Sequence, residues 1–166
     1  MLPILKRTFN LYISSFSGFS REVWFLTLIT FINRAGTMVI PFLSLYLTNH
    51  LNFSLGQVGW IMSCFGLGAL AGSWLGGKLT DKFGFYKVMF ISLLSTGFLF
   101  IALQYISTFR GFAAAIFLTM CVADSFRPAI FVALKAYSTP ENQTRSISLI
   151  RLAINLGFAF GPFLGG

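Results

Sequence analysis

Charged residues are scarce in this sequence. Asp, Glu, Lys and Arg together make up 10% of the 166 residues, and only four of them are acidic. Hydrophobic residues make up 56%, and the mean hydropathy is +0.80. A water-soluble domain needs a far more charged surface than this. The chain is therefore predicted to be an integral membrane protein whose main partner is the lipid bilayer.

Cysteine and histidine are also scarce, which excludes several kinds of site. Cys64 and Cys121 lie within apolar runs, where a small buried thiol is usual and a disulfide framework is not indicated. The single histidine, His50, has no Cys, Asp or Glu at ligand spacing and is predicted to be a solvated loop residue. No metal or other cofactor is expected. Without a nucleophile–base pair or a phosphate loop, an enzyme is not predicted either.

The net charge of +8 does not indicate a nucleic-acid-binding protein. The basic residues fall between apolar runs and form no continuous stripe, so no nucleic acid partner is expected. Near the predicted span ends, only Arg110 falls on one side of the membrane. The other side holds Lys6, Arg7, Arg21, Lys78, Lys82, Lys87, Lys135 and Arg145. The positive-inside rule then predicts a cytoplasmic N-terminus in the cytoplasmic (plasma) membrane.

Five apolar runs are long enough to cross a bilayer, which requires about 20 helical residues. The predicted spans cover residues of about 22–48, 55–77, 87–106, 111–135 and 140–166. The predicted fold class is thus an all-α membrane protein with a bundle of five transmembrane helices. Pro41 should bend the first span because it lacks a backbone N–H, and Ser54 and Gln57 form a capping box that begins the second.

The N-terminal segment, residues 1–20, is too interrupted by Lys6 and Arg7 to span a bilayer. An interfacial helix is the favoured interpretation. A signal peptide is the alternative, although no small-residue cleavage site follows the apolar part. At the other end, the chain is expected to stop within the fifth span.

Residues 77–84 separate the second and third spans. They place Asp81 between two lysines, with Gly77 and Gly84 at the ends, where either glycine can adopt a positive φ. A tight cytoplasmic turn is predicted, and a generic positively charged loop is the alternative. Gly77, Leu79, Asp81, Lys82 and Gly84 resemble the signature loop between the second and third helices of the major facilitator superfamily. That resemblance implies a gating loop made by Gly77, Asp81, Lys82 and Gly84.

Glycines recur every four residues in two of the predicted spans. One ridge is Gly68, Gly72 and Gly76, and the other is Gly157, Gly161 and Gly165, with Pro162 beside the second. Glycines on one helix face allow another backbone to approach closely. Both ridges are predicted to pack against helices outside this chain. Residues 157–166 also resemble a second signature of the superfamily, found on the fifth helix of drug and antiport-type members.

Four ionisable residues fall inside the predicted spans, namely Arg34, Asp124, Arg127 and Arg151. A charge at the bilayer centre costs roughly 2.5–3.5 kcal/mol, so such residues usually serve a function. Guanidinium groups are good ligands for carboxylates and phosphates. We therefore predict that Asn33, Arg34, Arg127 and Asn155 bind a substrate with an anionic group, and that Asp124 couples transport to protons. A purely structural Asp124–Arg127 ion pair is the alternative.

The resemblance to the major facilitator superfamily implies that these five helices are part of the N-terminal six-helix half of a twelve-helix transporter. Its partners would be a small-molecule substrate, protons and the remaining helices of the full-length protein. A further likeness is to the proton-coupled peptide transporter branch: Arg127-Pro128 stands where that branch has Lys-Pro, and Asn33 where it has Glu. Peptides and drug-like molecules are thus both candidate substrates. The alternative function is a small non-transporting membrane protein that assembles through its glycine ridges.

Overall fold

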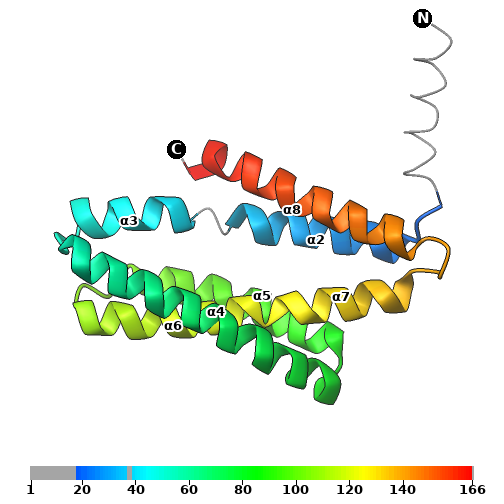
Figure 1. The fold of residues 1–166 in the computed structure, drawn as a ribbon, viewed down its shortest axis with the longest axis horizontal. Helices are drawn as coiled ribbons and strands as arrows, with labels where there is room; N and C mark the ends of the chain where they lie inside the picture. Colours follow the sequence, from blue (N-terminus) through cyan, green and yellow to red (C-terminus); the bar gives the residue numbers. More distant parts are fainter. Residues whose placement is uncertain (1–17, 37–38, 166) are drawn as a thin grey trace, which may run out of the picture.

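The computed structural model describes residues 18–36 and 39–165, and every regular element in this part of the chain is a helix. The helices are α2 (Arg21–Gly36), α3 (Val39–Asn49), α4 (Leu55–Phe83), α5 (Phe85–Leu103), α6 (Phe109–Asp124), α7 (Phe126–Tyr137) and α8 (Gln143–Gly165). They form an elongated bundle in which α2, α3 and α8 lie along one side and α4 to α7 along the other (Figure 1). The predicted interfacial segment lies outside the described residues, apart from residues 18–20.

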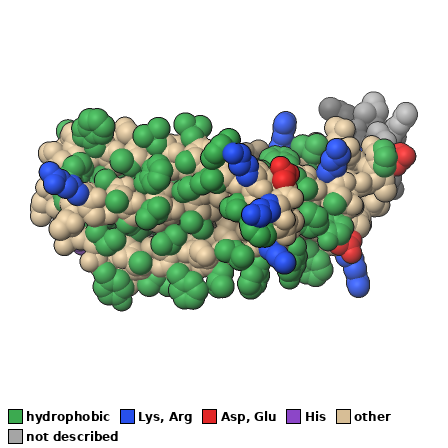
Figure 2. All heavy atoms as spheres, turned by 90° about the horizontal axis from the view of Figure 1, so that it is seen from below, with side chains coloured by type: hydrophobic (Ala, Val, Ile, Leu, Met, Phe, Trp, Pro, Cys, Tyr) green, Lys and Arg blue, Asp and Glu red, His purple; other side chains and the backbone are tan. Residues whose placement is uncertain are grey.

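Within the described residues, three helical stretches are long and apolar enough to cross a membrane: Leu55–Phe83, Phe85–Leu103 and Phe109–Tyr137. Large hydrophobic side chains, such as those of Leu70, Phe98 and Ile101, lie on the outside of the bundle. Figure 2 shows that such side chains are spread over the face formed by the lower helices of Figure 1. Apolar residues on this much of the surface are stable in contact with lipid, and the all-helical membrane fold predicted from composition is confirmed.

Two of the predicted spans are each formed by two helices in line. The first consists of α2, which ends at Gly36, and α3, which begins at Val39. The fourth consists of α6 and α7, which meet at Ser125. A proline lies shortly after each break. Pro41 and Pro128 cannot donate a hydrogen bond to the carbonyl four residues earlier, and this interrupts the regular helix. At the second break the Ser125 N–H donates to the Val122 carbonyl, three residues earlier, at 3.3 Å.

The connection between α4 and α5 is much shorter than residues 77–84. Helix α4 continues through Gly77 and Asp81 to Phe83, and only Gly84 makes the turn, with φ of +83°. This corrects the predicted turn, because a glycine inside a helix costs only about 1 kcal/mol and does not end it. Gly84, by contrast, adopts a conformation that a residue with a side chain rarely takes.

The capping box predicted at the start of the second span is present. The Ser54 hydroxyl accepts a hydrogen bond from the Gln57 N–H at 3.3 Å, and the Gln57 side chain accepts one from the Ser54 N–H at 2.9 Å. In the turn before α8, hydrogen bonds from the Glu141 backbone N–H and from the Thr139 side chain lower the pKa of the Glu141 carboxyl. Both arrangements give backbone N–H groups near helix ends a hydrogen-bond partner.

The buried side chains form two clusters at opposite ends of the bundle. One joins α2, α5, α7 and α8 around residues such as Val23, Ala129 and Ile150. The other joins α3, α4, α5 and α6 around residues such as Ile61 and Phe112. The break at Ser125 lies between these clusters, because Phe126 belongs to the first and Met120 to the second. Asp124 and Arg127 lie on either side of this break.

Candidate functional site

The glycine ridge of α4 lies directly against the backbone of α6. Gly68, Gly72 and Gly76 are all buried, and a Cβ atom at Gly72 would collide with the Cys121 carbonyl. A Cβ at Gly68 would likewise collide with the Phe117 carbonyl. The ridge therefore packs within this chain, which corrects the prediction that it faces helices outside it. The sequence shows the smooth face, but not which helix covers it.

Ser125 ties α4 to the junction of α6 and α7. Its hydroxyl is hydrogen-bonded to the Gly72 carbonyl at 3.1 Å and to the Cys121 carbonyl at 2.8 Å. This bond needs the close approach that Gly72 allows. The sequence pattern alone does not predict a role for Ser125, although a serine next to Asp124 in an apolar run is a signal of one. Ser125 is the residue at which α6 ends and α7 begins.

The glycine ridge of α8 also begins with a contact inside this chain. A Cβ at Gly157 would lie 2.7 Å from the Cβ of Arg34 and 2.9 Å from the Phe31 carbonyl. Gly157 therefore makes room for Arg34 on α2. Gly161 is buried as well. The side-chain surroundings of Pro162 and Gly165 lie outside the described part, but α8 runs through both positions.

Arg34, Asp124 and Arg127 come together from three helices. The Arg127 Nε lies 3.9 Å from Asp124 Oδ1, across the break between α6 and α7. Arg34 on α2 lies within electrostatic range of both residues. The exposed fraction is 8% for Arg34, and for the side chains of Asp124 and Arg127 it is 15% and 57%. The cluster thus has a buried cation, a nearly buried acid and a cation that points outward.

Asn33 and Asn155 differ in their relation to this cluster. Asn33 is half-buried next to Arg34 on α2. Asn155 is exposed, and it lies two positions from the buried residues Ala153 and Gly157, which is about 200° around the helix. Asn155 therefore lies on the face of α8 that turns away from α2. Within the described residues the fold does not bring it to the charged cluster.

The residues of the predicted gating loop lie at the end of α4. Asp81 and Lys82 are exposed in its last turn, and Lys78 Nζ lies 3.8 Å from the centre of the Trp74 ring. An acid at a helix C-terminus is unfavourable, because the helix dipole is negative there. No ion pair joins Asp81 to another residue of the described ranges. A favourable partner for Asp81 would have to come from outside the described residues.

Residues 23–166 match the family model described as Major Facilitator Superfamily. The chain is 29% identical over 152 residues to "Uncharacterized MFS-type transporter YqjV" of Bacillus subtilis (strain 168), which covers 86% of this chain and 35% of that protein. It is 25% identical over 154 residues to "Multi-drug resistance efflux pump PmrA homolog" of Lactococcus lactis subsp. lactis (strain IL1403), which covers 88% and 37%. The chain thus spans about a third of the length of the curated relatives it matches.

Proposed function

The chain belongs to the major facilitator superfamily, and on this basis we propose that it forms the N-terminal helices of a secondary transporter that moves a small organic solute by alternating access. The observation that carries the proposal is the cluster of Arg34, Asp124 and Arg127 inside an otherwise apolar bundle. Charges at this depth are costly and are retained where they bind or relay charge. The relatives point to a transporter rather than an enzyme.

The proposed substrate is a drug-like organic molecule with an anionic group. Arg127 points outward from the cluster with its side chain 57% exposed, so its guanidinium can reach a ligand. A guanidinium matches the geometry of a carboxylate or phosphate and can bind it through two parallel hydrogen bonds. Two relatives are named as multidrug proteins, which supports a drug-like solute over a peptide.

Asp124 is the proposed proton-coupling residue. It is the acidic residue of the cluster, and Arg127 is its ion-pair partner. When the substrate anion binds Arg127, the positive charge of Arg127 no longer fully balances the negative charge of Asp124. A carboxylate in a membrane interior must then gain a proton or another cation to avoid a large desolvation cost. Coupling would arise because the substrate and Asp124 compete for Arg127.

This proposal is tested on the protein expressed from its complete reading frame, with a panel of fluorescent organic anions and zwitterions. Asp124→Asn should keep substrate binding but abolish accumulation driven by a proton gradient, whereas Arg127→Ala should weaken binding by about tenfold or more. Arg110→Gln, at the start of α6, is the matched control and should change neither. If both site variants only lower the melting temperature, the pair is structural, and gradient-driven uptake by Asp124→Asn would exclude the coupling role.

The alternative function, a non-transporting membrane protein that assembles with partner helices, is less well supported by the structure. That alternative relied on glycine ridges that would face partner helices. Gly68, Gly72 and Gly76 instead pack on α6, and Gly157 packs on α2. These contacts are used within the bundle, so a transporter half is the better supported function.

A further inference from the structure

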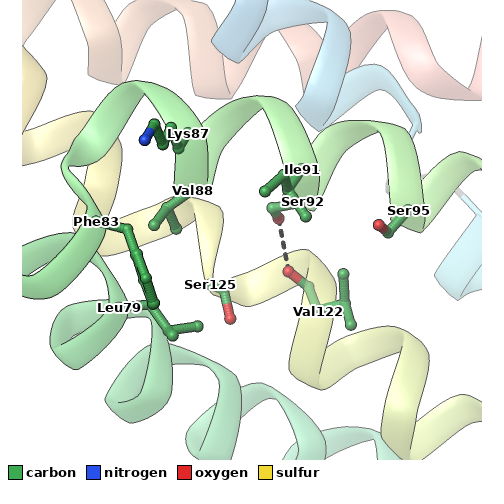
Figure 3. A pocket seen from close by; sticks show the side chains of 9 residues that line it. All are labelled: Leu79, Phe83, Lys87, Val88, Ile91, Ser92, Ser95, Val122 and Ser125. Atoms are coloured by element: carbon green, nitrogen blue, oxygen red, sulfur yellow. Dashed lines mark hydrogen bonds between the residues drawn. The ribbon is translucent and has the colours of Figure 1, made fainter.

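A cavity of about 370 Å³ lies between α4, α5 and the junction of α6 with α7. It is lined by Leu79, Phe83, Lys87, Val88, Ile91, Ser92, Ser95, Val122 and Ser125 (Figure 3). Its volume is within the range of roughly 300–1,000 Å³ that is typical of small-molecule sites. None of the three residues of the charged cluster lines it, so it is distinct from the proposed transport site.

The interior of this cavity is effectively apolar despite its serines. The Ser92 hydroxyl donates to the Val122 carbonyl at 2.6 Å, and the Ser125 hydroxyl is hydrogen-bonded to backbone carbonyls of Gly72 and Cys121. Hydroxyls that are bonded to the backbone have little remaining demand for a ligand. Apart from Lys87 and Ser95 at its two ends, the rest of the wall is leucine, isoleucine, valine and phenylalanine. Such a cavity favours a hydrocarbon chain over a hydrophilic solute.

One end of the cavity carries a positive charge. Lys87 lies at that end and Ser95 at the other, eight residues further along α5 (Figure 3). Eight residues of helix correspond to about 12 Å. Lys87 is exposed and lies three residues after the turn at Gly84. The turn region holds Lys78, Lys82 and Lys87 but only one acid, Asp81, and Lys78 is already stacked on Trp74.

We propose that the cavity binds one acyl chain of an anionic phospholipid, with the headgroup at Lys87. The apolar cavity matches the acyl chain of such a lipid, and the lysine at its end matches the anionic headgroup. Basic residues near a membrane surface attract anionic headgroups, and the α4–α5 turn lies on the predicted cytoplasmic side. A water-soluble anion would not fill the apolar cavity. A zwitterionic lipid would be attracted to the lysine less strongly, because its own cation offsets the phosphate charge. This lipid site does not depend on the proposed transport function.

The test is native mass spectrometry of the full-length protein with phosphatidylglycerol or phosphatidylcholine added at equal concentration. The wild type should retain one phosphatidylglycerol in preference to phosphatidylcholine. Lys87→Gln should reduce this preference roughly fivefold, which corresponds to about 1 kcal/mol for one basic residue at an anionic surface. Lys78→Gln is the matched control, because it removes a charge from the same turn but does not line the cavity.

A second variant tests the apolar part of the cavity. Ser95→Phe fills the inner end of the cavity and should reduce retention of both lipids. If Lys78→Gln lowers the preference as much as Lys87→Gln does, the effect is diffuse surface attraction and the site is excluded. If Ser95→Phe does not fold, Lys87→Gln still decides, because that residue is on the surface. Retention of phosphatidylglycerol unchanged in Lys87→Gln would overturn the proposal.

Discussion

At Gly72 the packing of α4 on α6 leaves no room for a side chain. An added Cβ would collide with the Cys121 carbonyl, which is part of a helix backbone and cannot rotate away. The Ser125 hydroxyl also reaches the Gly72 carbonyl across this contact. The close approach therefore supports both dispersion contacts and a hydrogen bond between helices. Substitution at this position therefore tests the packing of α4 on α6.

We predict that Gly72→Ala destabilises the protein by about 1–3 kcal/mol, the usual cost of overpacking. Gly77→Ala is the matched control on the same helix, because nothing lies within 4 Å of its added Cβ. That control should be neutral or stabilising by up to about 1 kcal/mol, since alanine is the better helix former. Melting temperature and folded yield are the measurements. Equal behaviour of the two variants would contradict the packing shown here.

Asp81 is predicted to matter for transport rather than for folding. It lies exposed in the last turn of α4, where the helix dipole disfavours an acid. Asp81→Asn should therefore leave the melting temperature unchanged or slightly higher. Transport should fall, because a carboxylate retained at an unfavourable place is expected to pair with a group in the other half during gating. Wild-type transport by Asp81→Asn would rule out the gating role.

Among the helices, interruption near a proline is the recurring feature. Helix α2 ends at Gly36, five positions before Pro41, and α6 ends at Asp124, four positions before Pro128. The second break places Asp124 and Arg127 on either side of Ser125, where they meet at 3.9 Å. A helix interruption frees backbone groups for other partners in a membrane interior. The break therefore helps to define the geometry of the charged cluster.

Pro128→Ala restores an N–H that can bond to the Asp124 carbonyl. We predict that it joins α6 and α7 into one regular helix and raises stability by up to about 3 kcal/mol, the cost of proline inside a helix. Transport should fall, because Asp124 and Arg127 would change their relative position. Pro140→Ala, in the turn before α8, is the control and should leave transport intact. A lower melting temperature in Pro128→Ala would contradict this explanation of the break.

On the scale of the whole molecule, the connections divide between the two ends of the bundle. The α4–α5 turn, the α7–α8 connection and the start of α2 lie at one end, and the α3–α4 and α5–α6 connections lie at the other (Figure 1). Arg21, Lys82, Lys87 and Arg145 belong to the first end, whereas Arg110 belongs to the second. This asymmetry is the arrangement that the positive-inside rule associates with a cytoplasmic first end.

The orientation is tested by cysteine labelling in intact cells. Starting from a Cys64→Ser, Cys121→Ser parent, His50→Cys should react with a membrane-impermeant maleimide. Lys82→Cys should react only after the cells are permeabilised. Both positions are exposed at helix ends, so their reactivity reports on the side of the membrane. The opposite labelling pattern would reverse the predicted topology.

The sequence by itself determined the class of molecule and several local features. Low charge and long apolar runs predict membrane helices, because charged groups cannot be spread through a bilayer interior. The capping box at Ser54 and the bend near Pro41 could be predicted from the sequence, because they depend on backbone groups within a few residues. Gly84 was likewise marked as a residue able to take a positive φ. These features are local, so neighbouring residues suffice to define them.

Only the tertiary structure decided which helices meet. The ridge at Gly68, Gly72 and Gly76 could face any backbone, and the fold placed α6 there rather than a helix outside the chain. Arg34 joins Asp124 and Arg127 because α2 packs beside α7, whereas Asn155 turns away on α8. Such contacts link residues that are far apart in the sequence, such as Gly72 and Cys121 or Arg34 and Asp124. The hydrophobic pattern does not specify them in lipid, where all apolar faces are nearly equivalent. Packing between small residues makes that choice.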